Sequence, residues 1–175
     1  MFYHTKLVYY EYVLLYTDDC LVISDRAETL LRNEIGKYFE LKKSSIGPPT
    51  KYLGGKLREV ELENGPKYWA FGSKQYVEAT VQNVDDYLKK GEKSLIAKAP
   101  TPMSCGYRSE IDVTPELGQE DAAYYYSLIG VLRWIVELGR VDIHVEGSML
   151  SSHLVLPREG HLQEFFMCLL ILRST

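Results

Sequence analysis

The chain has 175 residues, 46% of them hydrophobic and 25% charged, which suits a folded globular protein of one domain or two small subdomains. A formal net charge of −4 argues mildly against an independent nucleic-acid-binding module, because such modules are usually basic, yet it leaves room for a local basic groove. Three cysteines without a C-x-x-C spacing favour a reducing compartment. We expect neither a secretory signal nor a membrane span, since no apolar stretch reaches about 20 residues.

The first part of the chain is expected to hold two strands joined by a tight turn. From Lys6 to Ser24 the sequence is rich in Val, Leu, Ile and Tyr, and Thr17-Asp18-Asp19 interrupts it. The apolar runs on both sides are continuous rather than alternating, which predicts a hairpin covered on both faces apart from its tip. Asp25 is then expected to cap a helix with apolar residues at helical spacing, namely Ala27, Leu30, Leu31, Ile35 and Phe39.

A second hairpin is predicted from Lys51 to Val60 and from Lys67 to Phe71, with Asn64-Gly65 as its turn. Ser73 is expected to cap the next helix, and residues 89–114 hold turn formers with little periodicity, which predicts a long connection. The last third is predicted to be helical, and the fold class is therefore α+β. The predicted helices there are Ala122 to Leu138, Asp142 to Leu154 and Glu159 to Leu172, the last one preceded by Pro157.

The residues with the clearest chemical potential are Asp18 and Asp19, adjacent carboxylates at the expected tip of the first hairpin. Adjacent carboxylates repel one another, and a bound divalent cation would offset that repulsion. Mg²⁺ prefers carboxylate oxygens and substrate phosphates, and two such ions about 3.5–4 Å apart can clamp the attacking and leaving oxygens of nucleotidyl transfer. A plain turn is the alternative, because Asp is common in turns, where its side chain accepts local backbone hydrogen bonds.

The order of motifs along the chain is more specific than the Asp pair alone. An apolar strand, Tyr16-Thr17-Asp18-Asp19, a second apolar strand and a polar helix together resemble the palm hairpin of copia-type retrotransposon reverse transcriptases, which usually have Val in place of Thr17. Val141 stands where the family's Arg-Pro-Asp-Ile segment has Pro. The other segments similar to this family are Lys51 through Leu57, Gln75 through Val77, Tyr125 through Trp134, Arg140 through Ile143, Ser151 through His161 and Leu170 through Arg173.

The resemblance implies a fragment of an RNA-directed DNA polymerase. Its fold would be a partial reverse-transcriptase palm with β-hairpins, followed by a helical thumb and connection region. Residues 1–88 would form the partial palm and the start of the thumb, 89–114 a connecting segment, and 115–175 the truncated helical connection region. The implied partners are an RNA or DNA template-primer and a deoxynucleoside triphosphate, bound through the parent polyprotein.

The same resemblance implies roles for individual residues. Asp18 and Asp19 would be catalytic and would bind the metal, which is Mg²⁺ in this family, with Mn²⁺ as the alternative. Tyr16 matches a residue near the primer end. The implied primer-positioning hairpin holds Leu53, Gly54 and Gly55, where glycine permits a close backbone approach.

The family's third catalytic carboxylate and its fingers region lie upstream of the Tyr-x-Asp-Asp turn. Fifteen residues precede Tyr16, so we expect the isolated chain to be inactive as a polymerase. The alternative is a decayed or co-opted remnant that acts as a non-catalytic binding or scaffold protein. The sequence encodes no address and leaves the oligomeric state open, while the family implies an intracellular location, in a cytoplasmic particle or the nucleus.

Three other pairs of residues are expected to have structural rather than functional roles. His153 and His161 straddle Pro157 at a spacing that is unusual for zinc, so no zinc site is expected there. The pair Asp85-Asp86 repeats the Asp doublet in a polar stretch and is expected at a solvated helix end. Trp69 and Trp134 are expected in the core rather than as platforms for base stacking.

Overall fold

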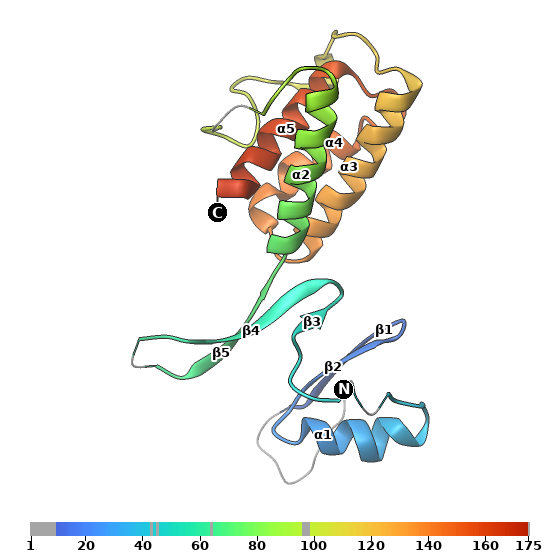
Figure 1. Ribbon diagram of the computed structural model, residues 1–175, viewed down its shortest axis with the longest axis vertical. Coiled ribbons are helices and arrows are strands. Elements are labelled where there is room, and N and C mark those ends of the chain that lie inside the picture. Colours follow the sequence, from blue (N-terminus) through green and yellow to red (C-terminus); the bar gives the residue numbers. More distant parts are fainter. Residues whose placement is uncertain (1–9, 43, 45, 64, 96–98, 175) are drawn as a thin grey trace. The chain divides into compact units, whose positions relative to one another are not determined.

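The computed structural model describes residues 10–42, 44, 46–63, 65–95 and 99–174 (Figure 1). The chain divides into two compact units, Met1–Ala70 and Phe71–Thr175. Strands dominate the described part of the first unit and helices that of the second (Figure 1), which confirms the α+β class. The functional division at residues 88 and 114 stays a prediction.

The first hairpin is present as predicted. Strands β1 (Tyr12–Tyr16) and β2 (Asp19–Ile23) pair antiparallel, with Tyr12 opposite Ile23 and Tyr16 opposite Asp19. The expectation that both faces are covered is wrong, because Leu15 is 64% exposed and Ile23 57%. Continuous apolar runs are typical of strands with a layer on each side, and the described part of the chain supplies no such layers.

The helix after this hairpin is shorter and less regular than predicted. One α-helical turn, α1 (Ala27–Thr29), continues as a π-helical turn, Leu30–Glu34, and then as a 3₁₀ turn, Ile35–Lys37. Leu30 is buried at 4% exposure, whereas Phe39 is 62% exposed. The apolar stripe is therefore buried at Leu30, near the start of the helix, and the buried part does not extend to Phe39.

The second sheet has three strands in the order β3-β4-β5. They are β3 (Lys51–Tyr52), β4 (Gly55–Glu61) and β5 (Lys67–Gly72), so the predicted strands exist. The predicted turn residue Asn64 lies outside the described residues. Trp69 on β5 is 53% exposed, so its expected core position is wrong, because this sheet offers no deep core to receive it.

The strand predicted from Lys51 to Val60 is interrupted by a tight turn. Tyr52 pairs with Gly55, which leaves a two-residue loop. Both loop residues have positive φ angles, 47° at Leu53 and 78° at Gly54. Two consecutive positive φ angles are the signature of a type I′ hairpin turn, whose twist matches that of its strands.

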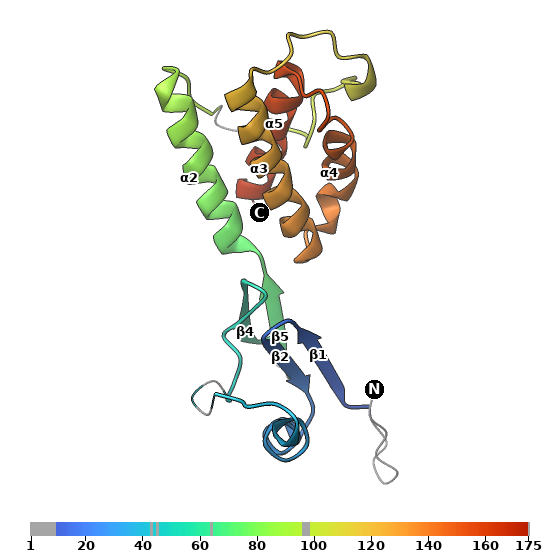
Figure 2. The same ribbon diagram turned by 90° about the vertical axis from the view of Figure 1, so that its right-hand side faces the viewer.

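The second unit is a packed group of helices (Figure 2). Helix α3 contacts both α2 and α4, and α5 also contacts both. Ser73 precedes the first helix as predicted, although its side chain makes no capping hydrogen bond. No helix in the described part of the chain has the length and apolar character that a membrane crossing needs. The elements are α2 (Lys74–Lys90), α3 (Gln119–Glu137), α4 (His144–Ser151), α5 (Glu159–Ser174) and the 3₁₀ turns Ser109–Ile111 and Val141–Ile143.

The core of the chain lies in this helical unit. Tyr125 is fully buried, and its hydroxyl donates a 2.8 Å hydrogen bond to the Leu150 carbonyl, so its polar atom is satisfied. Trp134 is partly buried. Buried apolar side chains from all four α-helices meet around Tyr125, including Val77, Val84, Leu88, Leu128, Ile129, Leu132, Ile135, Leu150, Phe165, Cys168 and Leu169.

The junction between α3 and α4 carries one of the segments that resemble the retroelement family. Gly139 has a φ of 112°, and hydrogen bonds from Gly139 N–H to Val136 and from Arg140 N–H to Ile135 form a Schellman motif. The Arg140 guanidinium then donates to both carboxylate oxygens of Asp142, at 2.9 and 2.7 Å. The role of this segment in the structure is therefore to turn the chain.

Candidate functional site

The two predicted catalytic carboxylates lie at the tip of the β1–β2 hairpin. Because Tyr16 pairs with Asp19, the loop consists of Thr17 and Asp18 alone, and Asp19 is the first residue of β2. The side chains of Tyr16, Asp18 and Asp19 are all exposed. Such a short loop restrains the two carboxylates more tightly than a longer one would, and leaves them accessible to an ion or to phosphate.

The backbone of this tip is strained at Thr17, whose φ is 49°. A positive φ is a genuine outlier for a β-branched residue and costs on the order of 1–3 kcal/mol. The tight hairpin loop accounts for it, because favoured two-residue turns need a positive φ at their first position. Thr17, and not Asp18, therefore carries the backbone strain of this turn.

The other end of the hairpin is tied to α1 by a buried acid that the sequence analysis missed. Glu11 is 2% exposed and accepts hydrogen bonds from Arg26 Nε at 2.8 Å and Arg26 Nη2 at 2.9 Å. Ser24 Oγ donates to Glu11 at 2.6 Å and accepts from the Arg26 N–H at 3.0 Å. The predicted cap at Asp25 is wrong, because Arg26 is the N-cap residue of α1. The Arg26 side chain makes no capping hydrogen bond, and the Arg26 N–H donates to Ser24 Oγ.

A signal for Glu11 was present in the sequence. It is an acidic residue inside an otherwise apolar run, and an arginine follows at Arg26. Buried charges are almost always paired, so a lone acid in a strand predicts a basic partner nearby. The partner could not be chosen without knowing how α1 folds back on the hairpin.

Tyr52, which precedes the predicted primer-contact turn, is influenced electrostatically by the carboxylate hairpin. Burial raises the pKa of the Tyr52 phenol, and the charges of Asp19 and Cys20 raise it further. Tyr52 is therefore within electrostatic range of Asp19 while it flanks the Leu53-Gly54 loop. Gly55, on the other side of that loop, is buried. Tyr52 and Asp19, which lie far apart along the chain, therefore interact electrostatically within the first unit.

The donor set at the tip suits a magnesium ion that keeps part of its water shell. Mg²⁺ is usually bound through one or two carboxylates together with water and substrate phosphates. The described residues hold no group of three or more His, Cys, Asp or Glu side chains that could bind a metal ion. Asp18 and Asp19 are thus two exposed carboxylates at one tip, and their role as ligands of Mg²⁺ or Mn²⁺ stays a prediction.

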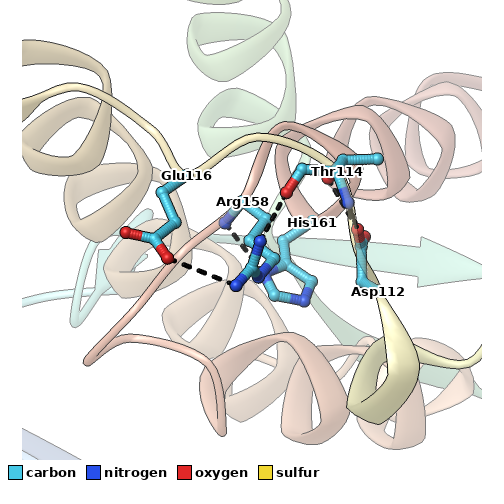
Figure 3. A network of polar contacts seen from close by, with 5 residues as sticks. All are labelled: Asp112, Thr114, Glu116, Arg158 and His161. Carbon is cyan, nitrogen blue, oxygen red and sulfur yellow. Dashed lines mark hydrogen bonds and ion pairs between the residues drawn. The ribbon is translucent and has the colours of Figure 1, made fainter.

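A second polar network closes the start of α5 (Figure 3). Thr114 donates through its N–H and hydroxyl to Asp112, at 2.7 and 2.6 Å, and its Oγ1 accepts the Gly160 N–H at 2.9 Å. Arg158 donates to the Thr114 carbonyl at 2.6 Å and forms an ion pair with Glu116 at 3.3 Å. This network satisfies backbone N–H groups that a helix N-terminus leaves open, so its role is structural.

His161 completes the same helix start. Its Nδ1 accepts the Arg158 N–H at 3.0 Å, in the manner of a capping box, and its Nε2 lies 3.2 Å from the Ser109 carbonyl. The His153 ring stacks on it, with ring centroids 4.3 Å apart. Both ring nitrogens of His161 are thus engaged in the fold, and neither is directed to a metal.

No family model and no solved structure matches the chain. The chain is 28% identical over 159 residues to a putative transposon Ty5-1 protein of Saccharomyces cerevisiae. The similarity supports a retrotransposon origin. The alignment covers 87% of this chain and 45% of the yeast protein, so the chain spans less than half of that relative's length. The metal, primer and nucleotide roles of the residues named above stay predictions.

Proposed function

We propose that this chain is a fragment of a copia-type RNA-directed DNA polymerase, in which Asp18 and Asp19 bind Mg²⁺ for nucleotidyl transfer. The observation that carries the proposal is the two-residue loop that presents adjacent carboxylates at the exposed tip of an apolar hairpin. The similarity to a yeast transposon protein is the independent support.

Each residue has a defined part in this proposal. When bound, Mg²⁺ stabilises the charge that develops on the phosphate oxygens. In the proposal Asp18 and Asp19 hold the ion, and Tyr16, which pairs with Asp19, contacts the primer terminus. The turn at Leu53 and Gly54 contacts the same primer in this proposal. The template-primer and the deoxynucleoside triphosphate are the proposed partners.

The test uses NMR of the full chain titrated with Mn²⁺, which broadens nearby amide signals even at a weakly bound site. We expect selective broadening of the amides of Asp18 to Cys20. The double change Asp18→Asn and Asp19→Asn should abolish that broadening. The matched control neutralises the second Asp doublet, Asp85-Asp86, and should leave it intact. Broadening that is unchanged when the hairpin doublet is neutralised would overturn the proposal.

The non-catalytic remnant is the second candidate. It is favoured by one observation, that the described residues supply no third carboxylate beside the Asp pair. In that case Mn²⁺ would broaden both Asp doublets equally, as expected for exposed carboxylates without a defined site. The same titration therefore separates the two candidates.

A further inference from the structure

The helical unit contains two Thr-Pro dipeptides, Thr101-Pro102 and Thr114-Pro115, whose hydroxyl groups have different surroundings. The Thr114 side chain is half-buried, and its hydroxyl donates to Asp112 at 2.6 Å and accepts the Gly160 N–H at 2.9 Å (Figure 3). Thr101 is exposed and lies outside the helices and strands, and its hydroxyl donates to the nearby Met103 carbonyl at 2.6 Å. Of the two hydroxyl groups, that of Thr101 is therefore the one that an enzyme can reach.

The segment around Thr101 has the features of a protein kinase substrate. A kinase must bind the accepting residue in an extended segment, which an exposed loop can supply and a packed helix start cannot. The proline that follows Thr101 biases this threonine toward extended backbone angles, and Pro102 itself offers no N–H that a kinase would have to satisfy. One class of serine/threonine kinases requires proline at this position.

The residues that follow Thr101 form a short strap, residues 101–104, that is fastened to α5. The Cys168 thiol donates to the Pro102 carbonyl at 3.0 Å, and Glu164 accepts the Ser104 N–H at 2.7 Å. Glu164 and Cys168 are four residues apart, so they lie one above the other on the same face of the helix. Met103, between the two fastened residues, packs against the hydrophobic core. The Thr101 hydroxyl supports the strap by bonding to the Met103 carbonyl.

The helix face under the strap is rich in negative charge. Glu164 is 6% exposed, and one carboxylate oxygen of Glu146 is buried without a hydrogen-bond partner among the described residues. The pKa of the Cys168 thiol is raised to about 12, chiefly by burial and then by the charges of Glu146 and Glu164. Both carboxylates therefore lie within electrostatic range of the sulfur that holds the strap. A further negative charge on the strap would be repelled here.

We propose that Thr101 is a phosphorylation site for a proline-directed serine/threonine kinase, and that the phosphate releases the strap from α5. In this step the bond from the γ-phosphorus of a nucleoside triphosphate to its β–γ bridging oxygen breaks, and a bond from that phosphorus to Thr101 Oγ1 forms. The nucleoside diphosphate leaves, and the hydroxyl proton passes to the base of the kinase.

Release of the strap follows from the chemistry of the modified side chain. Phosphothreonine has no Oγ1 proton to donate to the Met103 carbonyl, and its phosphate adds about 1.5 to 2 negative charges at neutral pH. That charge is repelled by the Met103 carbonyl oxygen and by the carboxylate of Glu164 at the other end of the strap. Cys168 then loses its cover. This proposal is independent of the proposed polymerase function, because it concerns the helical unit alone.

The first test incubates the folded full chain with ATP and a proline-directed kinase that phosphorylates synthetic peptides of residues 99–106 and 111–118 equally well. Mass spectrometry of the digested protein should find phosphate on Thr101 and little on Thr114. The variants Thr101→Ala, which lacks the acceptor, and Pro102→Ala, which keeps it but lacks the proline, should both stay unmodified. An unmodified Thr101 in the folded protein, or equal modification of both threonines, would overturn the assignment of the site.

The second test measures the rate at which iodoacetamide alkylates Cys168 before and after phosphorylation of the full chain. The rate should rise at least about tenfold, because loss of the bond from the Ser104 N–H to a carboxylate alone corresponds to roughly that factor. The half-buried Cys20 of the first unit is the internal control, and its rate should not change. Treatment with a phosphatase should restore slow alkylation of Cys168. A Cys168 rate that is the same with and without the phosphate would overturn the release of the strap.

Discussion

The carboxylate of Asp112 occupies the space beside Gly160 that a side chain at position 160 would need. This contact joins the loop before α3 to the first turn of α5, where the Gly160 N–H also binds Thr114. Glycine is needed here for close approach, and its φ is not in the left-handed region. The start of α5 is therefore fitted to one particular loop conformation.

Replacing Gly160 by Ala should destabilise the helical unit by about 1–3 kcal/mol, because the new methyl group displaces Asp112 and its hydrogen bonds. The control is Gly130→Ala in α3, where an added Cβ meets nothing within 4 Å. That change should instead stabilise by about 0.5–1 kcal/mol, since alanine favours a helix. Urea unfolding followed by circular dichroism measures both, and effects of the same sign would contradict this account.

The helical unit should lose stability as the solution is acidified. Burial lowers the pKa of His153, and the neighbouring His161 lowers it further. A histidine whose pKa is depressed on folding contributes stability that is present above its unfolded pKa of about 6.5 and is lost as pH falls through the folded value. Unfolding free energy should thus fall as the pH drops below about 6.5.

The variant His153→Gln should flatten this pH dependence, and His144→Gln, at an exposed position on α4, is the matched control. At lower pH the titration of Asp112 should cause a second loss of stability. Burial acts to raise its pKa, but hydrogen bonds from Thr114 and Tyr107 outweigh burial and hold that pKa below its usual value. Its contribution is lost only as pH falls below about 4. A pH profile unaffected by His153→Gln would show that the histidine pair is not responsible.

Replacing Glu11 by Gln should destabilise the first unit by about 1–3 kcal/mol, because the buried charge-assisted bonds to Arg26 are weakened. Urea unfolding monitored by Trp69 fluorescence, in a Trp134→Phe background, measures this. The control, Glu28→Gln, breaks the exposed pair with Arg32 and should cost at most about 0.5 kcal/mol. Similar effects of the two changes would mean that the Glu11 pair does not anchor the hairpin.

Replacing Thr17 by Gly should stabilise the first unit by about 0.5–1 kcal/mol, because glycine adopts a φ of 49° without strain. Thr29 has a φ of −65°, so Thr29→Gly in the helix should destabilise instead. The same fluorescence assay compares the two. A loss of stability in Thr17→Gly would show that the hydroxyl or the methyl group of Thr17 makes a contribution larger than the strain.

Local patterns predicted the elements well and their surroundings less well. The Asp18-Asp19 doublet between apolar runs correctly placed a hairpin turn, and the pattern from Ala122 to Leu138 correctly predicted the helix α3. The same apolar runs wrongly predicted a covered hairpin and a buried Trp69, since burial depends on the layers that other elements supply. A sequence pattern thus indicates which environment favours a side chain, whereas its actual burial depends on the elements that pack against it.

The parts of the site that depend on distant pairing were beyond prediction. The Leu53-Gly54 loop is local, but local patterning predicted one strand there, because Leu rarely adopts a positive φ; only the family resemblance implied a hairpin at this position. The Glu11–Arg26 pair could not be predicted from the sequence alone, because it depends on how α1 folds back on the hairpin. The nearness of Tyr52 to Asp19 depends on how two hairpins meet, which no short-range pattern encodes.

The uneven distribution of buried side chains has a consequence for recognition. Among the described residues of the first unit, Leu30 is the one deeply buried apolar side chain, whereas the helical unit holds an extensive core. Amides of the hairpins should therefore exchange with solvent through frequent local opening while those of α3 and α5 stay protected. A partner that binds the hairpins must then order them, and that entropic cost subtracts from its affinity. Weak, rapidly reversible binding is therefore expected for a partner of the first unit.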